Sequence, residues 1–158
     1  MDEELQRYRV EQAHAYLERI RKLGEDCAFL QAEVDDARER ASGLTGIDYS
    51  RDQVSTTPND DAMVDAVTAV KQAVREYALK LAEYIDERKR ASDAMMDMSD
   101  SSEVAALKLR YCLGKDWHDI SKFLGYSYDG VMKLRRRALL DYYDVMPSNE
   151  RDPKYSAI

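Results

Sequence analysis

Residues 116–146 read DWHDISKFLGYSYDGVMKLRRRALLDYYDVM, and the order of their cap and turn residues decides the fold. Asp116 can cap a short helix, because its carboxylate can accept hydrogen bonds from the free amides of the first turn. Gly125 can end that helix, since glycine adopts the left-handed backbone of a tight turn without a steric penalty. Ser127 can cap a second helix. The two helices are expected over residues 117–124 and 128–146, with a stop before Pro147.

The spacing inside this stretch is that of a helix-turn-helix, in which a tight turn sets the angle between two helices. Ser121 is small where the two helices must cross closely, and Gly125 follows it in the turn. Val131 can then return the second helix to the core. We expect the core around them to be completed by Ile120, Phe123, Leu124 and Leu134.

A supporting helix is expected before this pair. Asp100 and Glu103 stand three positions apart, which is the spacing of a capping box at a helix start. Gly114 can end this helix. Its apolar side is expected to consist of Val104, Leu107, Tyr111 and Leu113. The sequence therefore predicts a three-helix domain over residues 100–146.

The second helix of the pair has a polar outer face. On a helical wheel Leu134, Ala138 and Tyr142 fall on the same side as Val131, and charged residues fall opposite. Lysine and arginine can contact guanine, an aspartate can accept from cytosine, and a tyrosine can touch a thymine methyl or a phosphate. An ordinary solvated helix face is the alternative interpretation. The candidate DNA-binding residues are Tyr128, Asp129, Lys133, Arg136 and Arg137.

Three side chains near this face have structural interpretations. Trp117 is expected to pack in the core or against the preceding helix. His118 is expected to be exposed, and it has no partner at metal-ligand spacing. Arg135 falls near the apolar stripe and is expected to reach solvent or pair with an acid.

The first hundred residues predict two long helices. Residues 8–44 and 63–98 both repeat apolar side chains at steps of three and four, the spacing of a coiled-coil seam. Asp60 or Asp61 can cap the second of these helices. Residues 42–60 contain Gly, Pro, Ser, Asp and Asn and are expected to form a connection. Because neither helix can bury its stripe alone, we expect a coiled-coil-like antiparallel hairpin in an all-α protein.

This hairpin is assigned to residues 1–99, and residues 147–158 are expected to form a flexible tail. The seam changes phase at Gly24, where a bend or overwinding is plausible, and Arg88 is a polar seam residue that can fix register. The hairpin can serve as scaffold only, or it can join two chains into a homo-oligomer, most simply a dimer. The sequence leaves open whether the long helices pair within one chain or between chains.

Charge argues against general affinity for nucleic acid. The chain of 158 residues has 24 Lys and Arg against 31 Asp and Glu, a net charge of −7. Residues 1–100 have 14 basic and 23 acidic side chains, net −9, whereas residues 101–146 have 8 and 6, net +2. The acidity therefore belongs to the long helices, and the candidate DNA reader is mildly basic.

Other classes of protein are disfavoured. Cys27 and Cys112 form no CxxC pair, which favours a reducing cytoplasm over a disulfide framework. No run approaches the roughly 18 apolar residues of a membrane span, and the first residues lack an apolar signal core. We find no glycine-rich phosphate loop, nucleophile elbow or metal-ligand cluster, so we expect no cofactor, no metal and no enzyme activity.

The C-terminal third has Leu107, Leu109, Arg110 and Tyr111 in one helix, followed by the motifs at residues 117–121 and 124–127. In these residues it resembles region four of bacterial sigma factors. Asp119 stands where that family usually has Glu, and Ser121 where it usually has Ala. The whole chain is similar in character to small phage and prophage proteins, in particular the ArpU-type late transcription regulators. The positions that carry the resemblance are Leu107, Leu109, Arg110, Tyr111, Gly114, Trp117, His118, Asp119, Ile120, Ser121, Leu124, Gly125, Tyr126, Ser127, Val131, Ala138 and Leu139.

The resemblance implies binding of double-stranded DNA near a promoter and contact with RNA polymerase. It does not imply a complete sigma factor, because no stretch resembles the aromatic-rich region that melts promoter DNA. We therefore expect a sequence-specific transcription regulator of phage or prophage genes that reads the major groove with the helix over residues 128–146. The alternative is an acidic helical adaptor that contacts RNA polymerase or another phage protein without binding DNA.

Overall fold

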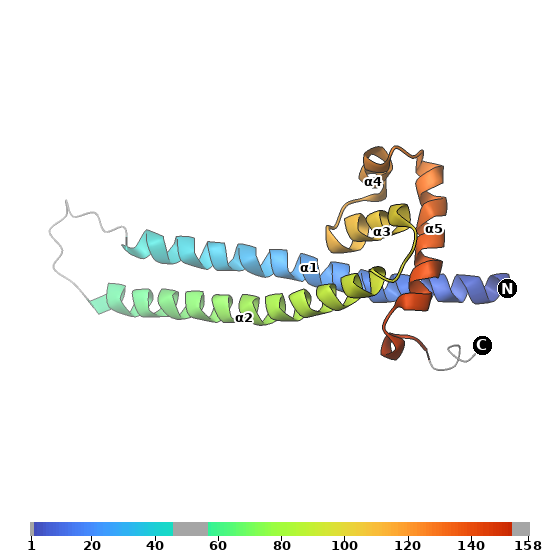
Figure 1. Cartoon of the computed structure of the whole chain (residues 1–158). Coiled ribbons are helices and arrows are strands. Elements are labelled where there is room, and N and C mark those ends of the chain that lie inside the picture. The colour runs from blue at the N-terminus through green and yellow to red at the C-terminus, as the bar shows by residue number, and fades with distance from the viewer. Residues whose placement is uncertain (1, 46–56, 153–158) are drawn as a thin grey trace. The chain divides into compact units, whose positions relative to one another are not determined.

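A computed structural model describes residues 2–45 and 57–152, and within these ranges it contains helices and no strand (Figure 1). The predicted all-α class is confirmed. None of the helices in these ranges is both long enough and apolar enough to cross a membrane. The elements are α1 (Glu3–Thr45), α2 (Thr57–Met95), α3 (Ser101–Leu107), the π-helical turn η1 (Lys108–Cys112), α4 (Trp117–Leu124), α5 (Tyr128–Val145) and the 3₁₀ turn η2 (Ser148–Glu150).

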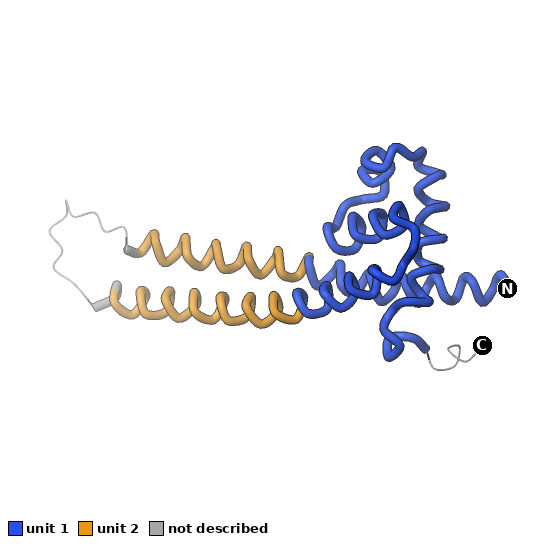
Figure 2. Tube along the Cα trace, viewed as in Figure 1, with its two compact units in different colours: residues 1–24, 84–158 blue, residues 25–83 orange. Residues whose placement is uncertain are grey.

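The chain divides into two compact units (Figure 2). Unit 1 consists of Met1–Gly24 and Tyr84–Ile158, and unit 2 consists of Glu25–Glu83. This division cuts through both long helices, whereas the expected domain boundary at residue 99 follows the elements along the chain. The domain boundaries drawn from the sequence therefore stay a prediction.

Unit 2 is built from the second part of α1 and the first part of α2, which run antiparallel (Figure 2). Cys27 and Val34 are its buried apolar side chains among the described residues. Burial raises the pKa of the Cys27 thiol, and the nearby Lys80 ammonium opposes this shift. Cys27, at the start of the α1 part of unit 2, therefore lies near Lys80, at the end of its α2 part, as an antiparallel hairpin requires.

The long helices begin and end at other residues than expected. Helix α1 begins at Glu3 rather than residue 8, since the acidic side chains of its first turn favour the positive end of the helix dipole. Helix α2 begins at Thr57, so Asp60 lies in its first turn and neither Asp60 nor Asp61 is the N-cap. The helix ends at Met95, because three turn hydrogen bonds close the chain over residues 96–98. Both helices thus extend into the expected connection 42–60, whose residues 46–56 lie outside the described residues.

Gly24 has a packing role in unit 1. Helix α1 continues through this residue without interruption. A Cβ atom placed on Gly24 would lie 3.1 Å from the ring and hydroxyl of Tyr84, so a larger residue there would require the Tyr84 side chain to shift. Arg88, the polar residue of the expected seam, is half-buried and its guanidinium lies 5.9 Å from the centre of the Tyr84 ring.

The main core of unit 1 joins both long helices to the C-terminal helices. The core includes Leu17 of α1, Met95 of α2, Tyr111 of η1 and Leu139 of α5, all of them buried. The hydroxyl of Tyr142 donates to the backbone oxygen of Ala91 over 3.1 Å, which satisfies a polar group inside this core. The C-terminal helices are therefore anchored on the long helices within unit 1.

The three N-caps expected within residues 100–146 are confirmed. The carboxylate of Asp100 accepts from the amides of Ser102 and Glu103 at the start of α3. The carboxylate of Asp116 accepts from the Asp119 amide over 2.8 Å at the start of α4. The hydroxyl oxygen of Ser127 accepts from the amide of Gly130 over 3.0 Å at the start of α5. Gly114 has a positive φ of 70°, as expected of a helix stop.

Two predicted core residues are wrong. Leu113 is exposed, because the π-helical turn adds a residue to the helix and rotates the positions after it; the Leu113 amide donates to the Lys108 oxygen, five residues back. Phe123 is 75% exposed, because Ile120, Val131 and Leu134 fill the core beside it. Leu124 is half-buried and packs against the same cluster.

The segment after α5 was expected to be loosely ordered, but its described part makes specific contacts in unit 1. The Glu150 carboxylate forms ion pairs with Arg19 and Arg90, each at 3.1 Å. The hydroxyl of Tyr8 donates to the Asp152 carboxylate over 2.7 Å. Residues 148–152 therefore belong to unit 1, and residues 153–158 lie outside the described residues.

Candidate nucleic-acid interface

The position of α5 depends on a small core that joins it to α3 and α4. Ala106 of α3, Ile120 of α4, and Val131 and Leu134 of α5 are all buried against one another. Trp117, partly buried, contacts both this cluster and the main core of unit 1. Because the inner face of α5 is packed in this way, its outer face is presented on a rigid support.

The turn between α4 and α5 depends on Gly125. This residue has φ 76° and ψ 23°, the left-handed conformation that side chains other than glycine rarely adopt. The amide of Tyr126 donates to the backbone oxygen of Ser121 over 3.0 Å, which closes the end of α4. Ser121 is buried, and its hydroxyl donates to the backbone oxygen of His118 over 2.6 Å. The expected conformation of Gly125 is therefore observed.

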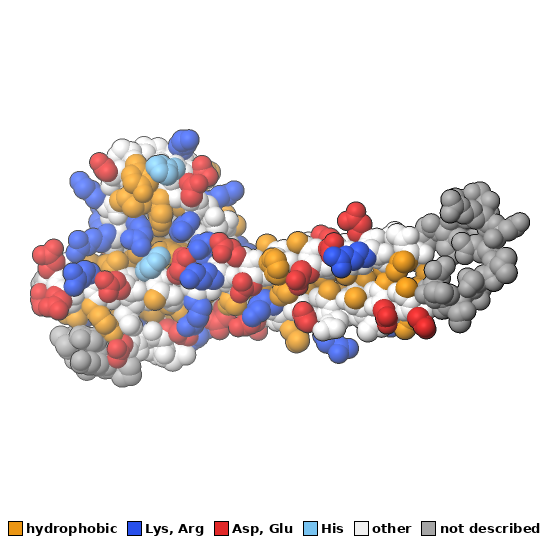
Figure 3. Space-filling model, turned by 180° about the vertical axis from the view of Figure 1, so that it is seen from behind, with side chains coloured by type: hydrophobic (Ala, Val, Ile, Leu, Met, Phe, Trp, Pro, Cys, Tyr) orange, Lys and Arg blue, Asp and Glu red, His pale blue; other side chains and the backbone are white. Residues whose placement is uncertain are grey.

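The candidate DNA-binding residues all lie on the surface. Leu134, Ala138 and Tyr142 are buried, as the helical wheel predicts for the inner side of α5. Figure 3 shows basic side chains among acidic ones over one face of unit 1. Opposite the buried residues of α5, the exposed side chains are those of Tyr128, Asp129, Lys133, Arg136 and Arg137.

Tyr128 is held in place by a residue of α4. The rings of His118 and Tyr128 stack with centroids 4.4 Å apart and planes 19° from parallel. Both side chains are exposed, and Tyr128 stands at the first position of α5. The stack orients the Tyr128 ring at the first turn of α5. The sequence interpretation of His118 as merely exposed missed this contact.

Arg137 is held on the opposite side by a buried carboxylate. Its Nε lies 3.7 Å from Oε1 of Glu103, whose side chain is almost fully buried in α3. Burial raises the pKa of Glu103 to about 7, and the carboxylates of Asp141 and Asp100 add to the shift while Arg137 opposes it. Arg137 therefore partly neutralises an acidic cluster beside α5, in addition to facing solvent.

Arg135 pairs with no acid among the described residues and is partly exposed. Its guanidinium lies 5.8 Å from the centre of the Trp117 ring, and Nη2 is 3.3 Å from Nδ1 of His14. The hydroxyl of Tyr111 is 2.7 Å from the same nitrogen. Burial and the positive charge of Arg135 lower the pKa of His14, which keeps the ring neutral and able to accept. The guanidinium of Arg135 is thus oriented by aromatic and imidazole contacts.

Two contributors to this surface were missed by sequence reasoning. Glu103 was expected only as part of a capping box, and its ion pair with Arg137 depends on how α3 packs on α5. The contact between His14 and Arg135 joins residues 121 positions apart in the chain, for which no local signal exists. By contrast, the stacking of His118 on Tyr128 follows from the short turn between α4 and α5.

We found no protein-family model, no curated protein and no solved structure that matches this chain. Within the part of the chain that the structure describes, no group of three or more His, Cys, Asp or Glu side chains could hold a metal ion. The functional argument therefore rests on the residues of the α4–α5 surface.

Proposed function

We propose that this chain is a sequence-specific DNA-binding transcription regulator that reads the major groove with α5. The observation that carries the proposal is the exposed face of α5, with Asp129, Lys133 and Arg136 on a helix whose other side is fully packed. An α-helix fits the major groove of B-DNA, and these side-chain types match base edges and phosphates there. The resemblance to sigma region four supports regulation of phage or prophage promoters and contact with RNA polymerase.

The charge distribution indicates that one α5 helix alone would bind DNA weakly. The whole chain has a net charge of −7, so non-specific attraction to DNA is small. Acidic side chains also border α5 itself, at Glu103 and Asp141. Useful affinity then requires either two readers on one DNA or a protein partner that is already bound there.

We propose that unit 2 pairs with unit 2 of another copy of this chain. The dimer then presents two α5 helices to one DNA. Val67 and Val74 stand one heptad apart on α2, and both are exposed although they belong to the regular seam. A second copy offers the same heptad spacing, so the two stripes can interdigitate as in a four-helix bundle. A light-scattering mass of two chains would support this pairing, and a mass of one chain at tens of micromolar protein would contradict it.

A protein-interaction adaptor is the second candidate, and one observation favours it. Phe29 and Leu79 of unit 2 are 65% and 70% exposed and lie outside the regular seams. Single exposed apolar residues are common, but two large ones on a charged hairpin suit a contact with another protein. In this function the α4–α5 surface would be structural only, and the protein would ignore DNA at low salt.

A selection from a random duplex library tests the DNA-binding function. The wild-type protein is expected to enrich one sequence, whereas a variant with Asp129→Ala and Lys133→Ala is expected to enrich a relaxed version of it. Enrichment of no sequence by the wild type would contradict the proposal. The two free, buried cysteines, Cys27 and Cys112, fit a reducing cytoplasm, which is where we propose that the protein acts.

A further inference from the structure

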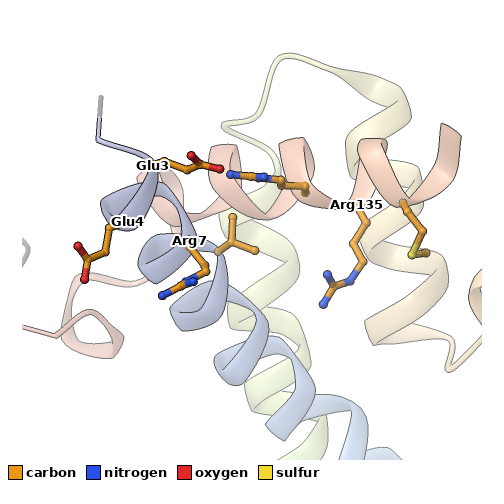
Figure 4. Close-up of a pocket in the computed structure, with 7 residues that line it drawn as sticks. Glu3, Glu4, Arg7 and Arg135 are labelled. Carbon is orange, nitrogen blue, oxygen red and sulfur yellow. The ribbon is translucent and has the colours of Figure 1, made fainter. Parts of the chain in front are cut away.

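A groove with three arginines lies beside the outer face of α5. It has a volume of about 600 Å³ and is partly open to solvent. Glu3, Glu4 and Arg7 line it from α1, and Arg135 and Arg136 line it from α5. Figure 4 shows Arg7 and Arg135 on two sides of this groove. All of these residues belong to unit 1.

Two of the three guanidinium groups, those of Arg135 and Arg136, form no direct ion pair across the described ranges. Arg135 is oriented by Trp117 and His14, and Arg136 is exposed on α5. Arg7 forms only a long ion pair of 3.9 Å with Glu11, between two exposed side chains. Such solvated pairs contribute little and exchange readily for another anion.

The occupant that fits these groups is a single phosphodiester. An arginine guanidinium presents parallel donors that match two phosphate oxygens, and it keeps its charge at any physiological pH. The groove has three arginines and two glutamates, Glu3 and Glu4, so its net charge is +1. This charge suits one singly charged phosphate rather than a polyphosphate.

The source of this phosphate follows from Arg136, which belongs both to the groove and to the exposed face of α5. A duplex that receives α5 in its major groove, about 12 Å wide, brings its sugar-phosphate backbone along the flanks of the helix. The groove lies along one flank, and the acidic pair Glu103 and Asp141 lies by Arg137.

We propose that the groove formed by Arg7, Arg135 and Arg136 binds a backbone phosphate of the same duplex that α5 reads. This inference rests on the proposed DNA-binding function. It makes the first turns of α1 part of the interface, with Arg7 as a phosphate contact and with Glu3 and Glu4 as residues that limit affinity.

The test compares two exposed arginines of α1 in the full-length protein. Arg7 and Arg40 are 74% and 78% exposed, and each has an acidic partner four residues away, at 3.9 Å and 3.0 Å. Arg7→Ala is expected to weaken binding of the selected duplex about 5- to 10-fold and to lower the slope of log affinity against log salt by about one. Arg40→Ala removes the same charge and ion-pair type and is expected to change affinity less than about twofold.

Two further readouts separate a backbone contact from a structural effect. Arg7→Ala is expected to weaken specific and unrelated duplexes by the same factor, because phosphates carry no sequence. Replacing Glu3 and Glu4 together by Gln is expected to raise affinity by about threefold or more at low salt. A loss confined to the selected duplex would contradict a phosphate contact.

The outcomes distinguish this inference from the proposed function. If the wild type binds the selected duplex but Arg7→Ala and Arg40→Ala have equal affinity and salt slope, the groove proposal is overturned and the function stands. If the wild type binds no duplex at low salt, both are overturned. A loss of affinity with Arg7→Ala that is equal for the two kinds of duplex, and that Arg40→Ala does not share, supports both.

Discussion

Units 1 and 2 share the same two long helices, yet they bury them very differently. In unit 1 the seam residues Leu17, Ile20 and Met95 are fully buried under the C-terminal helices. In unit 2 the seam residues Val67 and Val74 remain exposed, with the same heptad spacing. Apolar periodicity therefore predicts which face of a helix is apolar, but whether a given side chain of that face leaves water depends on what packs against it, since Cys27 and Val34 of unit 2 are buried.

The largest expected effect on stability is that of truncating a leucine, which should differ sharply between the two units. Leu17→Ala in unit 1 is expected to lower the free energy of unfolding by about 2–5 kcal/mol, because it leaves a cavity in a closed core. Leu79→Ala in unit 2, at a position 70% exposed, is expected to change it by less than about 0.5 kcal/mol. Urea unfolding of the two variants measures both values. Equal losses would mean that unit 2 is as closed as unit 1 in solution.

A buried carboxylate gives unit 1 a pH dependence that unit 2 is not expected to share. The pKa of Glu103 is about 7 in the folded protein against an ordinary value of 4.5, so folding favours its protonated form. The unfolded chain releases this proton first, and stability therefore falls as pH rises from about 4.5 to about 7 and stays reduced above it.

Glu103→Gln removes this loss, since the amide cannot ionise. The variant is expected to be more stable than the wild type by about 2–3 kcal/mol at pH 8 and nearly equal to it at pH 4. Thermal unfolding at the two pH values measures the difference, and the exposed Glu39→Gln in unit 2 is the control. A Glu103→Gln variant that is less stable at pH 8 would show that the ion pair with Arg137 outweighs the cost of burial.

Two glycines give the smallest effects, with opposite signs. Gly125→Ala in unit 1 is expected to cost about 1–2 kcal/mol, because its φ of 76° is unfavourable for any residue with a Cβ. Gly43→Ala in unit 2 is expected to stabilise by about 0.5–1 kcal/mol, because it lies in α1 with no atom near a new Cβ. Denaturant midpoints measure both, and a stabilising Gly125→Ala would contradict the assigned turn.

The elements of the C-terminal region could be predicted because their signals are local. Asp100, Asp116 and Ser127 cap the helices that follow them, and Gly125 sits in a turn that its neighbours define. Apolar spacing fails at Leu113, because the π-helical turn adds a residue to the helix and rotates this side chain out to solvent.

The candidate site was predictable only in part. Periodicity correctly separated the buried Leu134 from the exposed Lys133 and Arg136 on α5. The groove with Arg7 could not be predicted, because it forms where α1 and α5 meet more than a hundred residues apart in the chain. The ion pair of Glu103 with Arg137 likewise depends on how α3 packs on α5, which no local sequence pattern reveals.

The most direct test of the DNA-binding account is the affinity of one selected duplex for two triple variants, measured by fluorescence anisotropy over a salt series. The first variant lacks three exposed cations of α5, because Ala replaces Lys133, Arg136 and Arg137. The second lacks three exposed cations of unit 2, because Ala replaces Arg38, Arg40 and Lys71. The account predicts a loss of about 100-fold or more and a lower salt slope by about two to three for the first variant, with at most a few-fold loss for the second. Equal affinities and equal salt slopes for the two variants would contradict it.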